Sequence, residues 1–263
     1  VSMAVARAAA VSSRRPLYAY LREAFDLKDK EWLMPAPMFN VINGGKHADS
    51  GLDVQEFMVV PIGLLSFGEA LRAGAEIYQA LKKDLSAMSM TTAVGDEGGF
   101  APRLKDHAAA LDVLGLAVKK AGYAGRVSPA LDAAASEFYR DGAYFFEGKP
   151  LQAAEMAAVY SGWIKKHGIV SLEDPLAEDD WAGWKSLTRS LGGEAKIVGD
   201  DLFVTNVERL KRGIKEKAAN AILIKLNQIG TVTETVAAVR HAQKAGYSCI
   251  ISHRSGETED PFI

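Results

Sequence analysis

The sequence has 263 residues, of which 48% are hydrophobic and 24% charged, values typical of a globular protein with a large core. Its 31 basic and 33 acidic side chains leave a formal charge of −2, which offers no basic surface for nucleic acid or an anionic membrane. The single cysteine, Cys249, excludes a disulfide framework, and no apolar run is long enough to span a bilayer, so we expect a cytoplasmic protein.

The N-terminal stretch is Ala-rich and predicts an amphipathic helix that ends before Pro16. It lacks the basic start and apolar centre of a signal peptide. The sequence begins without an initiator Met and stops just after a polar cluster, so we expect a piece of a longer protein.

The next elements predict two strands followed by two helices. Residues 36–42 and 54–62 are strand-like, and the Gly-rich loop between them is too short for a parallel crossover, which predicts an antiparallel pair. One helix is expected from Ser66, with Glu69 completing a capping box, and another from Asp106 to about Gly122.

From about residue 126 onward, short apolar runs alternate with helical patterns. The apolar runs are residues 127–132, 168–174, 195–201, 220–227 and 247–253. Three helices are expected between them. One covers residues 152–167 and ends at Gly168, and the second has Asn206 as its N-cap. The third begins with a capping box of Thr231 and Glu234 and stops at Gly246. This alternation predicts a parallel sheet, either a barrel or a doubly wound fold.

Charged or polar residues stand at the C-terminal end of each predicted parallel strand. They are Asp132, Glu173 with Asp174, Asp200 with Asp201, Lys225, and His253 with Arg254. In parallel β/α folds the loops that form the active site meet at that edge. Taken singly, each acid could be a turn former or N-cap, and Lys225 could belong to a structural salt bridge.

Three of these acids suit a divalent cation. Asp132, Glu173 and Asp200 can each present an oxygen to one ion, and carboxylates that leave room for water and an anionic substrate favour Mg²⁺.

Two loops and several histidines add further candidates. The loop GDEGGFAP (95–102) is glycine-dense around Glu97, which would let this carboxylate approach a ligand closely, although a plain turn is the alternative. The segment HRSGETED (253–260) could hold a phosphate or carboxylate. His47 could be a ligand or a surface imidazole, whereas His107, His167 and His241 are interpreted as structural or solvent-facing, and Cys249 as a buried thiol.

The motifs together resemble the enolase family. NVINGGKHA, VQEFM, GDEGG, LDAAASEF, SLEDPLAEDDW, GDDLFVTN, IKLNQIGT and SHRSGETED are similar to enolase signatures and occur in the enolase order. The resemblance implies an α/β fold, a TIM-like β2α2(βα)6 barrel that lacks its last strand and helix. Residues 1–30 would be the tail of an N-terminal region with a connecting helix, and residues 31–263 the partial catalytic barrel.

The resemblance also implies residue roles. Lys225 would be the base at C2 of the substrate, Glu97 the general acid at the C3 hydroxyl, and Glu56 its neighbour. The Mg²⁺ ligands would be Asp132, Glu173 and Asp200, and the substrate contacts His47, Glu56, His253, Arg254 and Ser255. Burial and the neighbouring Mg²⁺ would both favour the uncharged amine of Lys225.

The activity implied is the Mg²⁺-dependent dehydration of 2-phosphoglycerate to phosphoenolpyruvate by a homodimer in the full-length protein. Turnover by residues 1–263 alone is expected to be negligible, because the closing loop and last strand of the family are absent. The alternatives are a non-catalytic fragment or binding role, and a sister enzyme acting on a sugar acid.

Overall fold

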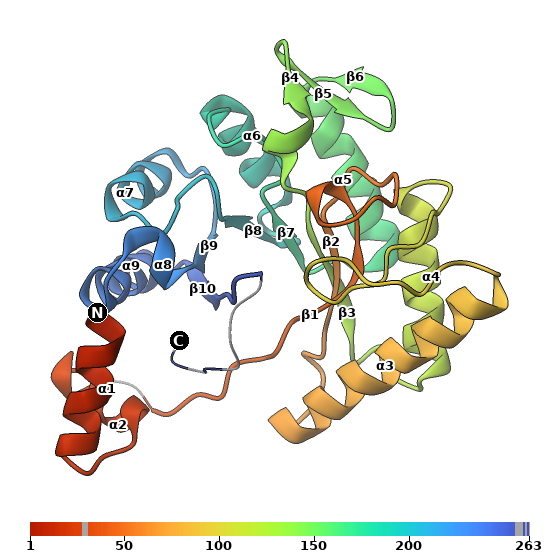
Figure 1. Ribbon diagram of the computed structural model, residues 1–263. Helices are drawn as coiled ribbons and strands as arrows, with labels where there is room; N and C mark the ends of the chain where they lie inside the picture. Colours follow the sequence, from red (N-terminus) through yellow and green to blue (C-terminus); the bar gives the residue numbers. More distant parts are fainter. Residues whose placement is uncertain (28–30, 256–259, 261, 263) are drawn as a thin grey trace.

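The computed structural model describes residues 1–27, 31–255, 260 and 262, and its centre is a curled seven-stranded sheet (Figure 1). The strand order is β1-β2-β3-β7-β8-β9-β10. The strands are β1 (Phe39–Asn43), β2 (Glu56–Val60), β3 (Ser128–Asp132), β7 (Ser171–Glu173), β8 (Lys196–Gly199), β9 (Ala221–Ile224) and β10 (Ser248–Ile251).

Strand directions follow the expected β2α2(βα) pattern. β1 pairs antiparallel with β2 and β2 antiparallel with β3, whereas every later neighbour pairs in parallel. The predicted antiparallel pair and the α/β barrel class are therefore confirmed. Within the described residues β1 and β10 are the two edges of the sheet, so the barrel is open.

Helices cover the outer side of the sheet (Figure 1). They are α3 (Phe67–Ala87), α4 (His107–Lys120), α5 (Ala153–His167), α6 (Trp181–Leu191), α7 (Val207–Glu216), the short α8 (Leu226–Ile229) and α9 (Val232–Lys244).

Side-chain caps hold these helices. Ser66 accepts the Glu69 amide, and Asn206 and Thr231 cap α7 and α9 as expected, while Asp106 caps α4 in the same way. The end of α5 at Gly168, in the left-handed conformation at φ 69°, is also as predicted.

The two faces of the sheet have different neighbours. Phe57, Leu131 and Ile197 point outward into the large core shared with the helices. The alternate residues point inward and form small apolar clusters, one of Met58, Val60 and Ala130 and one of Val198, Ala221 and Leu223. Because side chains alternate along a strand, residues two positions beyond this inner layer lie on the same face.

A small meander of β4 (Tyr139–Arg140), β5 (Ala143–Phe146) and β6 (Lys149–Leu151) was not predicted. Its two turns are Asp141-Gly142 and Glu147-Gly148, and all four residues have positive φ. Paired left-handed residues form the tight turns that join antiparallel strands, and Asp-Gly is a strong sequence signal for them. The stretch YRDGAYFFEGKPL therefore carried a hairpin signal that the interpretation overlooked.

The N-terminal helices α1 (Ser2–Ser12) and α2 (Leu17–Ala24) lie beside α9 (Figure 1). The amide of Val232 donates to Ser2 Oγ at 3.0 Å, and Arg240 donates to the carbonyl of Asp26 at 3.0 Å. The expected domain boundary at residues 30 and 31 adjoins residues 28–30, which lie outside the described ones. No helix in the described part of the chain is long and apolar enough to cross a membrane.

The thiol of Cys249 is only partly buried, so the expectation of a buried thiol was wrong. Cys249 lies on β10, an edge of the open sheet, where fewer neighbours cover it.

Candidate active site

A row of carboxylates crosses three neighbouring strands. Glu56 on β2 lies opposite Asp132 on β3, and Asp132 lies beside Glu173 on β7. Residues in one register row point to the same face, so all three carboxylates occupy the inner face of the sheet. Only 5% of Asp132 and 7% of Glu173 is exposed, and burial of such charge is costly without compensating partners.

Asp200 and Lys225 extend this row to the next two strands. Asp200 lies two residues beyond inward-facing Val198, and Lys225 two beyond Leu223. Lys225 Nζ forms an ion pair with Asp200 Oδ2. Gln228 also approaches Asp200 at 3.3 Å, and the Lys225 amide donates to Thr205 Oγ1 at 2.8 Å.

Asp174 supports the segment that carries Asp200. This residue has a positive φ of 39° and is 4% exposed. Its carboxylate accepts the amides of Asp200 at 2.9 Å and Asp201 at 2.7 Å. The sequence interpretation noted Asp174 at a strand end without giving it a role, and the acidic pair directly after β7 was the available signal.

Two groups within the described residues bring three metal-capable atoms within 4.8 Å of one another. They are His47 with Glu56 and Glu97, and Asp174 with Asp200 and Asp201. The set expected to bind Mg²⁺, which is Asp132, Glu173 and Asp200, lies on one face but is not this tightly gathered.

Mutual repulsion and burial control protonation in the row. Burial and the charge of Asp200 raise the pKa of Asp132 to about 7. Burial, with Asp132 and Asp200 nearby, holds the pKa of Glu173 well above its usual range, and the pKa of Asp174 is raised by burial and the same two neighbours. A cation bound among these carboxylates would relieve that repulsion, and hard oxygen donors without sulfur or nitrogen fit Mg²⁺.

Two opposing influences act on the pKa of Lys225. Burial lowers it, but attraction and hydrogen bonding to Asp200 outweigh burial, so the pKa of Lys225 is raised. The ion pair with Asp200 stabilises the ammonium form, and the preference for a neutral amine beside Mg²⁺ stays a prediction.

The glycine-rich loop brings Glu97 to the β1–β2 side of the row. A Cβ on Gly95 would lie 2.5 Å from the His47 carbonyl, and one on Gly99 would lie 2.7 Å from Asn43 Oδ1. Only glycine permits this close packing of the loop against His47 and Asn43.

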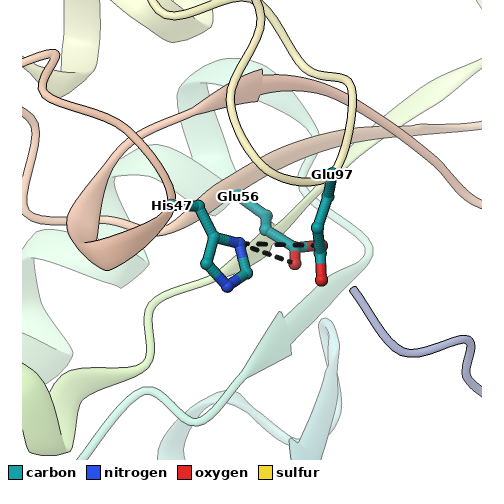
Figure 2. Close-up of side chains that lie close together, drawn as sticks. All are labelled: His47, Glu56 and Glu97. Atoms are coloured by element: carbon teal, nitrogen blue, oxygen red, sulfur yellow. Dashed lines mark ion pairs between the residues drawn. The ribbon is translucent and has the colours of Figure 1, made fainter. Parts of the chain in front are cut away.

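Figure 2 shows His47, Glu56 and Glu97 converging. Nδ1 of His47 lies 3.7 Å from Glu56 Oε1 and 3.7 Å from Glu97 Oε2. The two carboxyl groups share a hydrogen bond. Burial, the bond to Glu97 and the charge of Asp132 keep the pKa of Glu56 well above its usual range. Burial also raises the pKa of Glu97, but hydrogen bonds from His253, Glu56 and Ser255 prevail and lower it.

The segment after β10 completes the site. Ser255 Oγ donates to Glu97 Oε1 at 2.6 Å, and His253 Nε2 lies 3.5 Å from Glu97 Oε2. Arg254 lies near enough to Lys225 to oppose its positive charge. The site residues predicted from the sequence thus follow or begin different strands, and they lie together at one end of the sheet.

The chain is similar to a known family and to known proteins. The family described as "Enolase, C-terminal TIM barrel domain" matches residues 31–263. An enolase of Elusimicrobium minutum is 59% identical over the whole chain, and an enolase of Acidothermus cellulolyticus is 56% identical. The chain spans 62% and 61% of the lengths of these two relatives. With 233 of 263 residues inside the match, the chain belongs to the enolase C-terminal TIM barrel family.

Proposed function

We propose that this chain provides the catalytic residues for the Mg²⁺-dependent dehydration of 2-phospho-D-glycerate to phosphoenolpyruvate, a step of glycolysis and gluconeogenesis. The observation that carries the proposal is the placement of a lysine and a glutamate pair on the two flanks of one carboxylate row. Lys225 follows β9 on one flank, and Glu56 and Glu97 lie at β2 on the other. A dehydration needs a base for one carbon and an acid for the hydroxyl on the next.

Lys225 is the proposed base for the C2 proton. Removing that proton places further negative charge on the substrate carboxylate beside it. When bound by Asp132, Glu173 and Asp200, Mg²⁺ would supply positive charge against this and weaken the hold of Asp200 on the Lys225 ammonium. The side chains themselves keep Lys225 in place through Asp200 and Thr205.

Glu97 is the proposed acid for the C3 hydroxyl, with Glu56 beside it. The hydrogen bond between the two carboxyl groups and the raised pKa of Glu56 support a proton-bearing carboxyl group at this pair. His47 and His253 contact this pair and would orient the substrate, while Arg254 and Ser255 would bind its phosphate.

A homodimeric, cytoplasmic enzyme is part of the proposal, as the resemblance to the enolase family implies. The direct test is a chimera in which the chain replaces the matching region of the Elusimicrobium minutum enolase. Formation of phosphoenolpyruvate would be followed by absorbance with and without Mg²⁺. Turnover that requires Mg²⁺ and is lost in Lys225→Ala supports the proposal, and turnover that survives this substitution contradicts it.

A further inference from the structure

His107 is a buried imidazole that the proposed chemistry does not use. It begins α4 and is 1% exposed, stacked against Phe146 with ring centroids 4.5 Å apart. Its Nε2 accepts the backbone amides of Asp53 at 2.8 Å and Val54 at 3.2 Å. These amides belong to the last residues before β2.

The contacts identify the tautomer of this ring. Two N–H donors directed at Nε2 require a lone pair there, so Nε2 carries no proton. The Asp53 carboxylate is 3.7 Å from Nε2, too far to accept a hydrogen bond from it. The single ring proton therefore lies on Nδ1, which donates to Glu147 Oε1 at 2.7 Å.

Three segments close into a ring of hydrogen bonds around this imidazole. Glu147 stands in the β5–β6 turn, and its carboxylate accepts from both the ring and the backbone amide of His107. The Glu147 amide in turn donates to Asp53 Oδ2 at 2.8 Å, and the Asp53 amide donates back to His107. We call these three residues the His107 latch.

The latch ends where the candidate site begins. The next residue after Val54 is Gln55, whose amide donates to the Asp132 carbonyl at 3.0 Å and whose side chain donates to Asp132 Oδ2 at 2.9 Å. Glu56 follows directly, in register with Asp132. Asp53 and Val54 thus directly precede the two residues that contact or face Asp132.

We propose that His107 is a positioning residue, which acts as a neutral acceptor held by Glu147 and fixes the backbone from which Gln55 and Glu56 enter the active site. The importance of that site rests on the proposed function. The latch itself can be tested without any turnover, so failure of one can be told from failure of the other.

The first measurement is the tautomer in the intact 263-residue chain. With histidine-selective ¹⁵N labelling, the expected His107 signals are a protonated Nδ1 and an unprotonated Nε2. A protonated Nε2 would overturn the proposal, whatever the enzymatic activity.

The second measurement is amide hydrogen exchange in matched variants. His107→Phe keeps the stacked ring and removes the acceptor, so exchange at Asp53, Val54 and Gln55 should rise at least about tenfold relative to amides of β9. His107→Gln places an amide oxygen near the lost Nε2 and should restore most of the protection. His241→Gln on the surface of α9 is the control and should change none of these amides.

A uniform rise across β9 as well would indicate a purely structural role and contradict the proposal. The same holds if His107→Gln protects no better than His107→Phe. Should His107→Phe fail to fold, Glu147→Ala takes its place, because it removes the partner that fixes the tautomer. Unchanged exchange at Asp53 in Glu147→Ala would also overturn the latch.

Discussion

Glu56 faces Asp132 directly across the antiparallel β2–β3 ladder, so a partly buried and a buried carboxyl group meet on the inner face of the sheet. The charge of Asp132 is one of the causes that raise the pKa of Glu56. Neither group can ionise without affecting the other, which couples the proposed metal side of the site to the proposed acid side.

The raised pKa of Asp132 predicts how the free energy of unfolding depends on pH in the presence of a chelator. The native pKa of Asp132 is about 7, above its ordinary value of 3.8, because of burial and Asp200. Between these values the folded state holds a proton that the unfolded state has lost. The contribution of protonated Asp132 to the free energy of unfolding is therefore complete below the ordinary pKa of 3.8. It is lost as the pH rises through about 7.

Asp132→Asn should weaken the dependence of the unfolding free energy on pH. Between the ordinary and the native pKa of Asp132, the substitution should remove about 1.4 kcal/mol per pH unit from that dependence. Denaturant unfolding at several pH values between 4 and 8, with EDTA present, measures it. Asp112→Asn, on an exposed side chain, is the control, and an equal slope in both variants would show that Asp132 does not titrate in this range.

A second prediction separates the two carboxylate sets that share Asp200. If Mg²⁺ binds Asp132, Glu173 and Asp200, Glu173→Gln should remove the rise in melting temperature that Mg²⁺ produces. Asp174→Asn should lower stability, because Asp174 accepts two backbone amides, yet keep a rise with Mg²⁺. The reverse pattern in thermal unfolding with and without Mg²⁺ would assign the ion to Asp174, Asp200 and Asp201.

A third prediction concerns the packing behind Asp200. The Phe203 ring lies between Gly199 and Gly213, and a Cβ on Gly213 would come 2.3 Å from it. Alanine usually stabilises a helix interior relative to glycine, but here the buried ring cannot move away. Gly213→Ala should cost about 1–3 kcal/mol in unfolding free energy.

The matched control for that packing is Gly162→Ala in α5, where the added Cβ has no atom within 4 Å. It should stabilise the chain by about 0.5–1 kcal/mol, measured by the same urea unfolding. A gain in both variants would show that Phe203 has room to relax.

Local sequence signals were sufficient for most of the fold. Caps such as Ser66, Asp106 and Thr231 act within one helical turn, so the sequence alone locates these helix starts. The antiparallel start followed from loop length alone. The β4–β6 meander was not predicted, although Asp141-Gly142 is a local signal for it. The meander interrupts the alternation of strands and helices from which the neighbouring elements were predicted.

Contacts between distant residues could not be derived in this way. The sequence predicted that Asp200 and Lys225 share one end of the sheet, but their ion pair and its effect on the Lys225 pKa depend on the stagger of β8 and β9. The pKa of Glu97 likewise depends on a hydrogen bond from Ser255, which lies 158 residues away along the chain. The burial of His107 could not be predicted without the meander, because its partner Glu147 lies in the β5–β6 turn.

The final prediction separates the proposed base from the proposed acid, in the chimera with the Elusimicrobium minutum enolase. Lys225→Ala should abolish both dehydration and exchange of the C2 proton with solvent, because the proton cannot leave without a base. Glu97→Gln should suppress dehydration and leave C2 exchange measurable, because proton removal comes before loss of the C3 hydroxyl. Each loss should be about 10²–10⁴-fold.

Dehydration is followed by absorbance and C2 exchange by proton NMR in deuterated water. Lys215→Ala, at an exposed position on α7, controls for the loss of a positive charge. The roles can be compared only if both active-site variants keep the melting temperature of the parent and its rise with Mg²⁺. This check is needed because Lys225 pairs with Asp200, and its removal leaves that carboxylate buried without its ion-pair partner. If Lys225→Ala kept C2 exchange, or Glu97→Gln lost exchange as completely as dehydration, the two roles would have to be reassigned. Glu56 would then be the next residue to test as the acid, because its pKa is raised.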